Sequence, residues 1–228
     1  MLSRSAVAAE WRLARARLIR SRLGLWLALL AAGLAELGAR AAVPDPAGLA
    51  ARSGMMAAVL AVAFTAGSDA DRAALPLTLT HPTTPLSLAL GRWLGAVTVA
   101  ALPMLAATTA VGIARSPSPL ALLAANAGGL AAAGAAAACA LALVWVGGNA
   151  GAGFLFLYIG VLSGLSPVGV RYLAPHGALP RAAEWMLALL PALWRYRVLA
   201  AGSAVAWLHA GLWITGGIAL AAWRVSRR

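Results

Sequence analysis

Long apolar segments, separated by short polar ones, follow one another along most of this 228-residue chain. A transmembrane helix needs roughly 20 mostly apolar residues, and six segments are predicted to form one. The chain is therefore predicted to be an all-α integral membrane protein with six transmembrane helices. The predicted spans cover residues 23–42, 50–67, 86–114, 120–146, 154–170 and 202–223.

The first 22 residues differ from the spans because they hold six arginines. Val7, Trp11, Ala14 and Leu18 recur at helical spacing and form a narrow apolar stripe. A basic helix with such a stripe is typical of one that lies in the headgroup region of a membrane. We therefore divide the chain into an N-terminal amphipathic interfacial helix, residues 1–22, and a six-span domain, residues 23–228.

The most polar internal segment lies between the second and third predicted spans, at residues 66–95. It is longer than a simple turn between two helices requires, and it carries acidic, basic and proline residues. We expect it to form a structured docking element at the membrane surface, with residues 69–85 as its centre. The candidate contact residues are Asp69, Asp71, Arg72, His81 and Pro82.

A second unusual segment, residues 171–201, precedes the last span. Its apolar centre, residues 185–193, is about half the length that a span requires. We expect residues 175–197 to form a re-entrant helix pair, which enters the membrane and returns without crossing. The alternative is that residues 182–200 cross, which would place Arg195 and Arg197 in the hydrocarbon, at a cost of roughly 2.5–3.5 kcal/mol each.

Two polar residues inside the spans are candidates for lining a substrate path. Glu36 lies toward the far end of the first span, where it either pairs with Arg40 or faces the path. Asn126 lies in the fourth span, which is so rich in alanine and glycine that we expect it to be the most enclosed helix. It either forms a hydrogen bond between helices or faces the path. Cys139, the only cysteine, is expected to be a buried thiol.

Composition supports the membrane class. The chain is 62% hydrophobic and 11% charged, with a mean hydropathy of +0.85, whereas a soluble domain is about half apolar and a quarter charged. The net charge is +12, but the arginines lie at the ends of apolar segments. This placement indicates contact with a membrane surface, and no nucleic-acid partner is expected.

The arginines also predict an orientation. In a six-span topology, eleven arginines lie on the side of both termini and of the segment between spans two and three, and seven lie on the other side. Because positive residues are enriched in cytoplasmic loops, both termini and this segment are predicted to be cytoplasmic.

Residues Asp71-Arg72, followed by THPTTPLSLALGRWLG at 80–95, resemble a stretch of the permease subunit of type-2 ABC exporters. The likeness lies in an acidic start, a turn of proline and hydroxyl residues, and a leucine-rich entry into the third span. A weaker likeness covers residues 179–194. Where that family often has a Gly-Thr pair, this chain has Ala73-Ala74, and Pro76 is additional.

The resemblance implies a multi-pass subunit of the bacterial cytoplasmic (inner) membrane that hydrolyses nothing itself. A separate ABC ATPase subunit would bind ATP and Mg, and residues 69–85 would form the coupling helix that contacts it. A second permease, either another copy or a paralogue, would complete the substrate path. No cofactor and no metal are expected in this chain.

Three alternatives remain at this stage. The size and plan also resemble the haem-exporter permease of cytochrome c maturation, for which haem would be the substrate. A second alternative is a structural subunit of a membrane complex that transports nothing. A third is an intramembrane serine protease that uses Ser163 and His209. Against the protease, residue 161 is valine, where such enzymes have the glycine of a Gly-x-Ser motif.

Overall fold

The computed structural model describes residues 4–22, 26–27, 29–31, 45–67, 84–174 and 176–227. These residues form helices and turns, and none of them lies in a strand. Within the described residues, four helical stretches are long and apolar enough to cross a membrane, which indicates a membrane protein. They are α3 (Pro46–Val62) with the π-helix η1 (Ala63–Gly67), α6 (Pro85–Arg115), α7 (Pro119–Leu157) with the π-helix η2 (Tyr158–Leu162), and α11 (Ala204–Ser226).

Large apolar side chains cover the outward faces of these helices. Leu102 on α6, Leu123 on α7 and Leu208 on α11 are 51%, 67% and 66% exposed. A soluble monomer rarely exposes apolar surface on this scale. The outward faces therefore suit contact with lipid.

Four helices begin with the same two-residue signal. A side-chain oxygen accepts a hydrogen bond from a backbone N–H in the first turn, and a proline occupies the first helical position. Both features favour a helix start. A first-turn N–H has no partner inside the helix, so the capping side chain supplies one, and proline has no N–H that would need a partner. The pairs are Asp45-Pro46 for α3, Thr84-Pro85 for α6, Ser118-Pro119 for α7 and Ser166-Pro167 for α8 (Pro167–Leu173).

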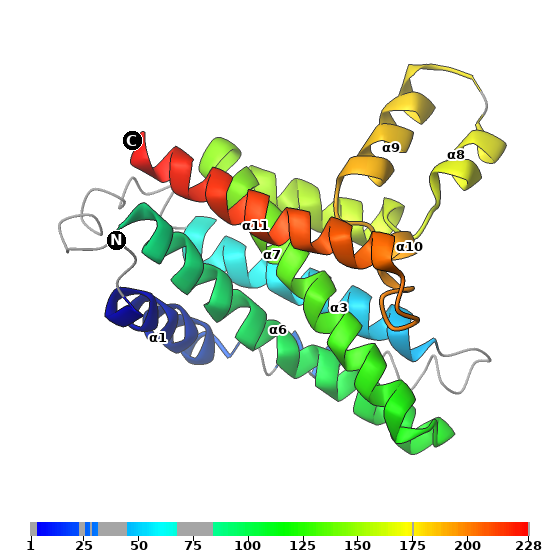
Figure 1. Ribbon diagram of the computed structural model, residues 1–228, viewed down its shortest axis with the longest axis horizontal. Helices are drawn as coiled ribbons and strands as arrows, with labels where there is room; N and C mark the ends of the chain where they lie inside the picture. The colour runs from blue at the N-terminus through cyan, green and yellow to red at the C-terminus, as the bar shows by residue number, and fades with distance from the viewer. Residues whose placement is uncertain are drawn as a thin grey trace.

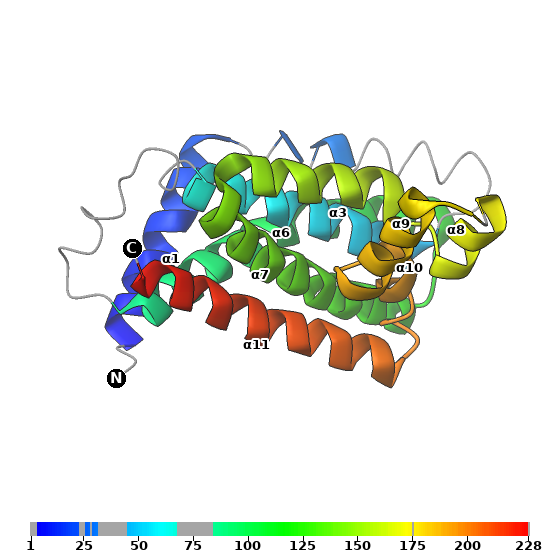
Figure 2. The ribbon, with the colours of Figure 1, turned by 90° about the horizontal axis from the view of Figure 1, so that it is seen from above.

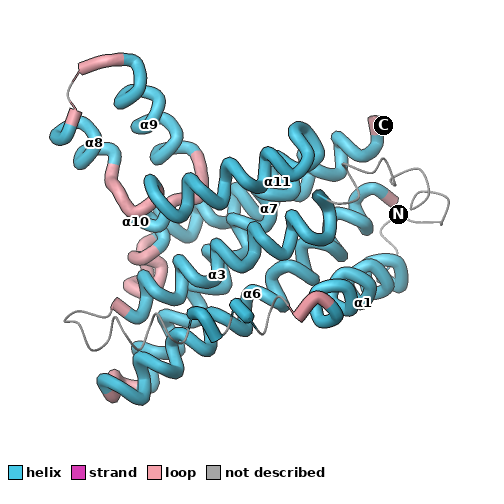
Figure 3. Tube along the Cα trace, turned by 180° about the vertical axis from the view of Figure 1, so that it is seen from behind, coloured by secondary structure: helices cyan, strands magenta, loops and turns pink. Residues whose placement is uncertain are grey.

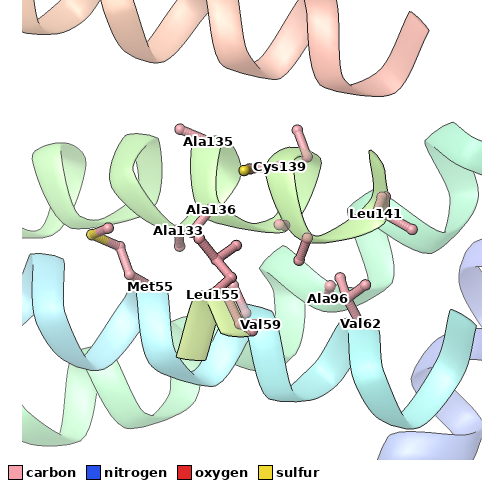
Figure 4. Close-up of a cluster of buried hydrophobic side chains, with 14 of the residues drawn as sticks. Met55, Val59, Val62, Ala96, Ala133, Ala135, Ala136, Cys139, Leu141 and Leu155 are labelled. Carbon is pink, nitrogen blue, oxygen red and sulfur yellow. The ribbon is translucent and has the colours of Figure 1, made fainter. Parts of the chain in front are cut away.

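The alanine-rich part of α7 lies at the centre of the bundle. Of its most apolar window, 78% is buried, compared with 50%, 44% and 28% for the other three long helical stretches. Among the described spans, the prediction that this helix is the most enclosed is therefore confirmed. Ala133 and Ala136 belong to the same buried cluster as Val59 of α3 (Figure 4). A Cβ on Gly54 of α3 would lie only 3.3 Å from the Ala133 Cβ, since small side chains let helix backbones approach closely. Cys139 is a buried thiol, as expected.

The chain reverses direction inside α7. Gly147 and Gly148 leave helical geometry, and Gly148 has a φ of +59°. The second limb, residues 149–162, then runs back beside the first (Figures 1 and 2). The limbs are so close that a Cβ on Gly151 would lie 2.6 Å from the Leu143 carbonyl oxygen. The bounds predicted for the fifth span, residues 154–170, are therefore wrong, because this limb starts at 149 and ends at Leu162.

Short helices occupy the two ends of the bundle. α1 (Arg4–Arg20) runs across the end at which α11 finishes, which we call the termini end (Figures 1 and 2). At the opposite end, α8 and α9 (Ala178–Leu189) protrude from the bundle, and α10 (Leu193–Tyr196) leads into α11 (Figures 1 and 3). Of the first predicted span, only residues 26–27 and 29–31 are described, and they are helical.

Candidate functional site

The residues predicted to contact an ATPase, Asp69, Asp71, Arg72, His81 and Pro82, lie outside the described part of the chain, as does Glu36. The structure does show the residues that flank this segment on either side. Gly67 closes η1, and Thr84 caps the start of α6. The end of η1 and the start of α6 lie at the termini end, where α1 packs on both elements (Figures 1 and 2).

α1 packs tightly across α6 at this end. A Cβ on Gly95 would lie 2.6 Å from the Cβ of Ala14, and one on Gly91 would overlap the side chain of Glu10. Trp11 Nε1 also donates a hydrogen bond to Thr98 Oγ1 at 3.1 Å. The predicted stripe therefore faces the bundle, since Ala14 and Leu18 are buried.

The termini end carries most of the positive charge among the described residues. Nine described arginines lie on α1, just after it, at the start of α6 or at the end of α11, and six lie toward the opposite end. Arg92, near the start of α6, is only 3% exposed, and its guanidinium lies 5.6 Å from the centre of the Trp145 ring. This cation–π contact joins α6 to α7 close to the start of α6.

At the opposite end, side chains from several elements cap the C-terminus of α9. The last four carbonyl groups of a helix have no partner within the helix. Here the carbonyls of residues 186–189 all accept hydrogen bonds from side chains. We call the five donor side chains the α9 cap: Tyr158, Trp194, Arg195, His209 and Trp213. Tyr158 Oη donates to Met186 O (3.2 Å), Trp194 Nε1 to Leu187 O (3.2 Å) and Arg195 to Ala188 O (3.0 Å). Leu189 O accepts from both His209 Nε2 (3.2 Å) and Trp213 Nε1 (2.6 Å).

The α9 cap fixes the short helices onto the bundle. Burial raises the pKa of Tyr196, so its hydroxyl keeps its proton and can donate to His209 Nδ1, 2.9 Å away. His209 then carries its proton on Nε2, which lets it donate to the Leu189 carbonyl. The end of α9 is thereby tied to α10 and α11. Sequence reasoning missed this cap because its acceptors are backbone carbonyls.

α8 and α9 are linked by an ion pair between Arg171 Nε and Glu184 Oε2, at 2.8 Å. α9 has 12 residues, a length of about 18 Å, which is too short to cross a hydrocarbon core of about 30 Å. The chain leaves helical geometry at Leu190, just before Pro191. The alternative of a continuous crossing helix over residues 182–200 is therefore wrong. Entry of the pair into the membrane stays a prediction.

Asn126 joins two helices. Its Oδ1 accepts a hydrogen bond from Thr108 Oγ1 of α6 at 2.9 Å, and the pair is partly buried. This contact is the interhelical hydrogen bond that the sequence offered as one reading of the residue. Its place on a substrate path stays a prediction.

Ser163 and His209, the proposed protease pair, bond to different partners. Ser163 Oγ donates to the Ile159 carbonyl at 2.7 Å and is fully buried. Both ring nitrogens of His209 are engaged by Tyr196 and Leu189. Ser163 is therefore a helix-bonded hydroxyl, and His209 belongs to the α9 cap.

A scan against protein-family models finds no family that matches this chain. A search of curated proteins finds no match either. What the chain does must therefore be inferred from its own residues and their arrangement.

Proposed function

We propose that this chain is the transmembrane permease subunit of a type-2 ABC exporter, driven by ATP that a separate ATPase subunit hydrolyses. One observation carries the proposal: short helices lie at opposite ends of a bundle of long ones. The basic helix α1 crosses the termini end, and α8, α9 and α10 lie at the other end, directly before the last long helix. This arrangement of helices supports the resemblance of residues 71–72 and 80–95 to the permease subunit of type-2 ABC exporters.

The packing around the coupling segment suits the transmission of force. The proposed coupling segment, centred on residues 69–85, follows η1, the continuation of α3 that ends at Gly67, and leads into α6, which Thr84 caps. A partner that moves this segment would therefore act on both α3 and α6. α3 in turn packs closely on α7, where a Cβ on Gly54 would lie 3.1 Å from the Gly129 carbonyl oxygen. Interiors packed this closely shift as units rather than deforming smoothly.

The arginine distribution gives the proposal its orientation. The termini end, with most of the described arginines, would face the cytoplasm, where ATP is available. The α8–α9 pair would then lie at the outer face of a bacterial cytoplasmic membrane and enter the outer leaflet. A second copy or a related permease would complete the path, with Glu36 and Asn126 as candidate lining residues.

Purification of the tagged chain from its own membranes tests the proposal. An ABC ATPase should be recovered with it in equal number to the permease chains, and mass spectrometry should identify that ATPase by its nucleotide-binding motifs. Recovery of a stable membrane complex that contains no ATPase would contradict the proposal and favour a structural subunit.

A further inference from the structure

Two cavities line up along one side of α3. The first, of about 170 Å³, lies between α3, beside Leu49, Arg52 and Met56, and described residues of the first predicted span, Leu27, Leu30 and Ala31. The second, of about 440 Å³, lies beside Ala63, Phe64 and Asn149. Both are also lined by Leu60 and by Phe156 of the second limb of α7, so they adjoin each other. Together they form one groove, which we call the α3 groove.

The groove is long, and its lining is apolar except for Arg52, Ser53 and Asn149. Its positions on α3 and η1 recur at helical spacing along one face: Leu49, Arg52, Met56 and Leu60 on α3, and Phe64 on η1. From Leu49 to Phe64, a rise of 1.5 Å per residue gives a length of about 22 Å, much of a hydrocarbon core of about 30 Å. An extended apolar chain fits this shape better than a compact molecule does.

One end of the groove carries a positive charge. Arg52 lies six residues into α3, about 9 Å along the helix, and its side chain is exposed. A guanidinium at this depth is costly unless anionic or polar groups surround it. One of its nitrogens donates to the Gly160 carbonyl oxygen of η2 at 2.7 Å. A guanidinium has five N–H donors, so this bond holds the side chain in place and leaves donors for a ligand.

We propose that the α3 groove binds an anionic phospholipid of the surrounding membrane. An acyl chain lies along Met56, Leu60 and Phe156, and the lipid phosphate meets Arg52. Charge complementarity favours this occupant, because a guanidinium pairs with phosphate oxygens through two parallel hydrogen bonds. The proposal does not depend on the transport function.

Native mass spectrometry tests the proposal on the full chain, released from nanodiscs made of equal amounts of phosphatidylglycerol and phosphatidylcholine. The wild-type chain should retain phosphatidylglycerol in preference to phosphatidylcholine. Arg52→Gln should reduce that retention roughly tenfold, as expected for the loss of a charged hydrogen-bonding partner. Arg197→Gln, an exposed arginine at the same end and outside the groove, should leave retention unchanged.

A second variant fills the groove without touching Arg52. Gly153 lines the second of the two cavities, and a Cβ there would meet nothing within 4 Å. Gly153→Leu should therefore fold and lose retained phosphatidylglycerol. Gly211→Leu, an equally open position on α11 and outside the groove, should retain it.

Four results would overturn the proposal. The first is unchanged retention in both Arg52→Gln and Gly153→Leu. The second is equal retention of the two lipids by the wild-type chain. The third is displacement of the lipid by inorganic phosphate alone, since the site would then recognise phosphate without the acyl chain. The fourth is a lipid-free dimer that Gly153→Leu dissociates, because a second copy would then occupy the groove.

Discussion

Replacement of Gly217 by leucine is expected to lower the free energy of unfolding by about 3 kcal/mol or more. Gly217 is buried where α11 crosses α7, and a Cβ there would lie 2.7 Å from the Ala138 carbonyl oxygen and 2.9 Å from the Ala138 Cβ. The nearest atoms belong to backbone or to a rigid alanine, so the two helices must separate. Thermal unfolding in detergent, followed by tryptophan fluorescence, measures the loss.

The neighbouring residue supplies a matched control. Gly216 is exposed on the same helix, and a Cβ there would meet nothing within 4 Å. Gly216→Leu should leave stability unchanged or raise it slightly, because leucine favours a helix more than glycine does. Equal unfolding temperatures for the two leucine variants would show that the close crossing of α11 and α7 does not contribute to stability.

Replacement of Asp71 and Arg72 together by alanine is expected to release the ATPase, or to abolish ATP-driven transport, while the permease still inserts. Both charges lie in the segment that we propose as the coupling helix, and a charged hydrogen bond at an interface is worth about 1.5–3 kcal/mol. Loss of two such contacts should weaken assembly by a factor of 100 or more. The ratio of ATPase to permease in the purified complex measures the effect.

Glu10→Ala with Arg12→Ala serves as the control for this pair. It also removes one acidic and one basic residue at the termini end, but from α1. Alanine preserves the helix, so this variant should keep its ATPase. If the Asp71/Arg72 variant retains full assembly and transport, residues 69–85 are not the coupling contact.

Several elements could be predicted from the sequence because local chemistry determines them. The N-terminal helix follows from the spacing of Trp11, Ala14 and Leu18, and the enclosed position of α7 follows from its alanine content. The Ser166-Pro167 pair is a helix-start signal of the same kind as Thr84-Pro85. That signal would have shown that the fifth span ends before residue 166, whereas the prediction extended it to 170.

Other features depend on contacts between distant residues. Residues 147–153 lie outside the fourth and fifth predicted spans, yet of them only Gly147 and Gly148 leave helical geometry. Residues after Gly148 are helical, and the lack of a side chain at Gly151 lets this second limb pack against Leu143. The α9 cap likewise brings Tyr158, Trp213 and backbone carbonyls together from separate elements, and the spacing of residues in the sequence does not reveal it.

Site-specific photo-cross-linking from residue 83 tests the proposed function most directly. Thr83 directly precedes the residue that caps α6 at the termini end, whereas Ser116 lies at the opposite end of α6. A photoreactive amino acid at position 83 should cross-link to the ATPase in native membranes, and one at position 116 should not. A cross-link from 116 but not from 83, or no ATPase adduct from either position, would contradict the assignment of this chain as an ABC permease.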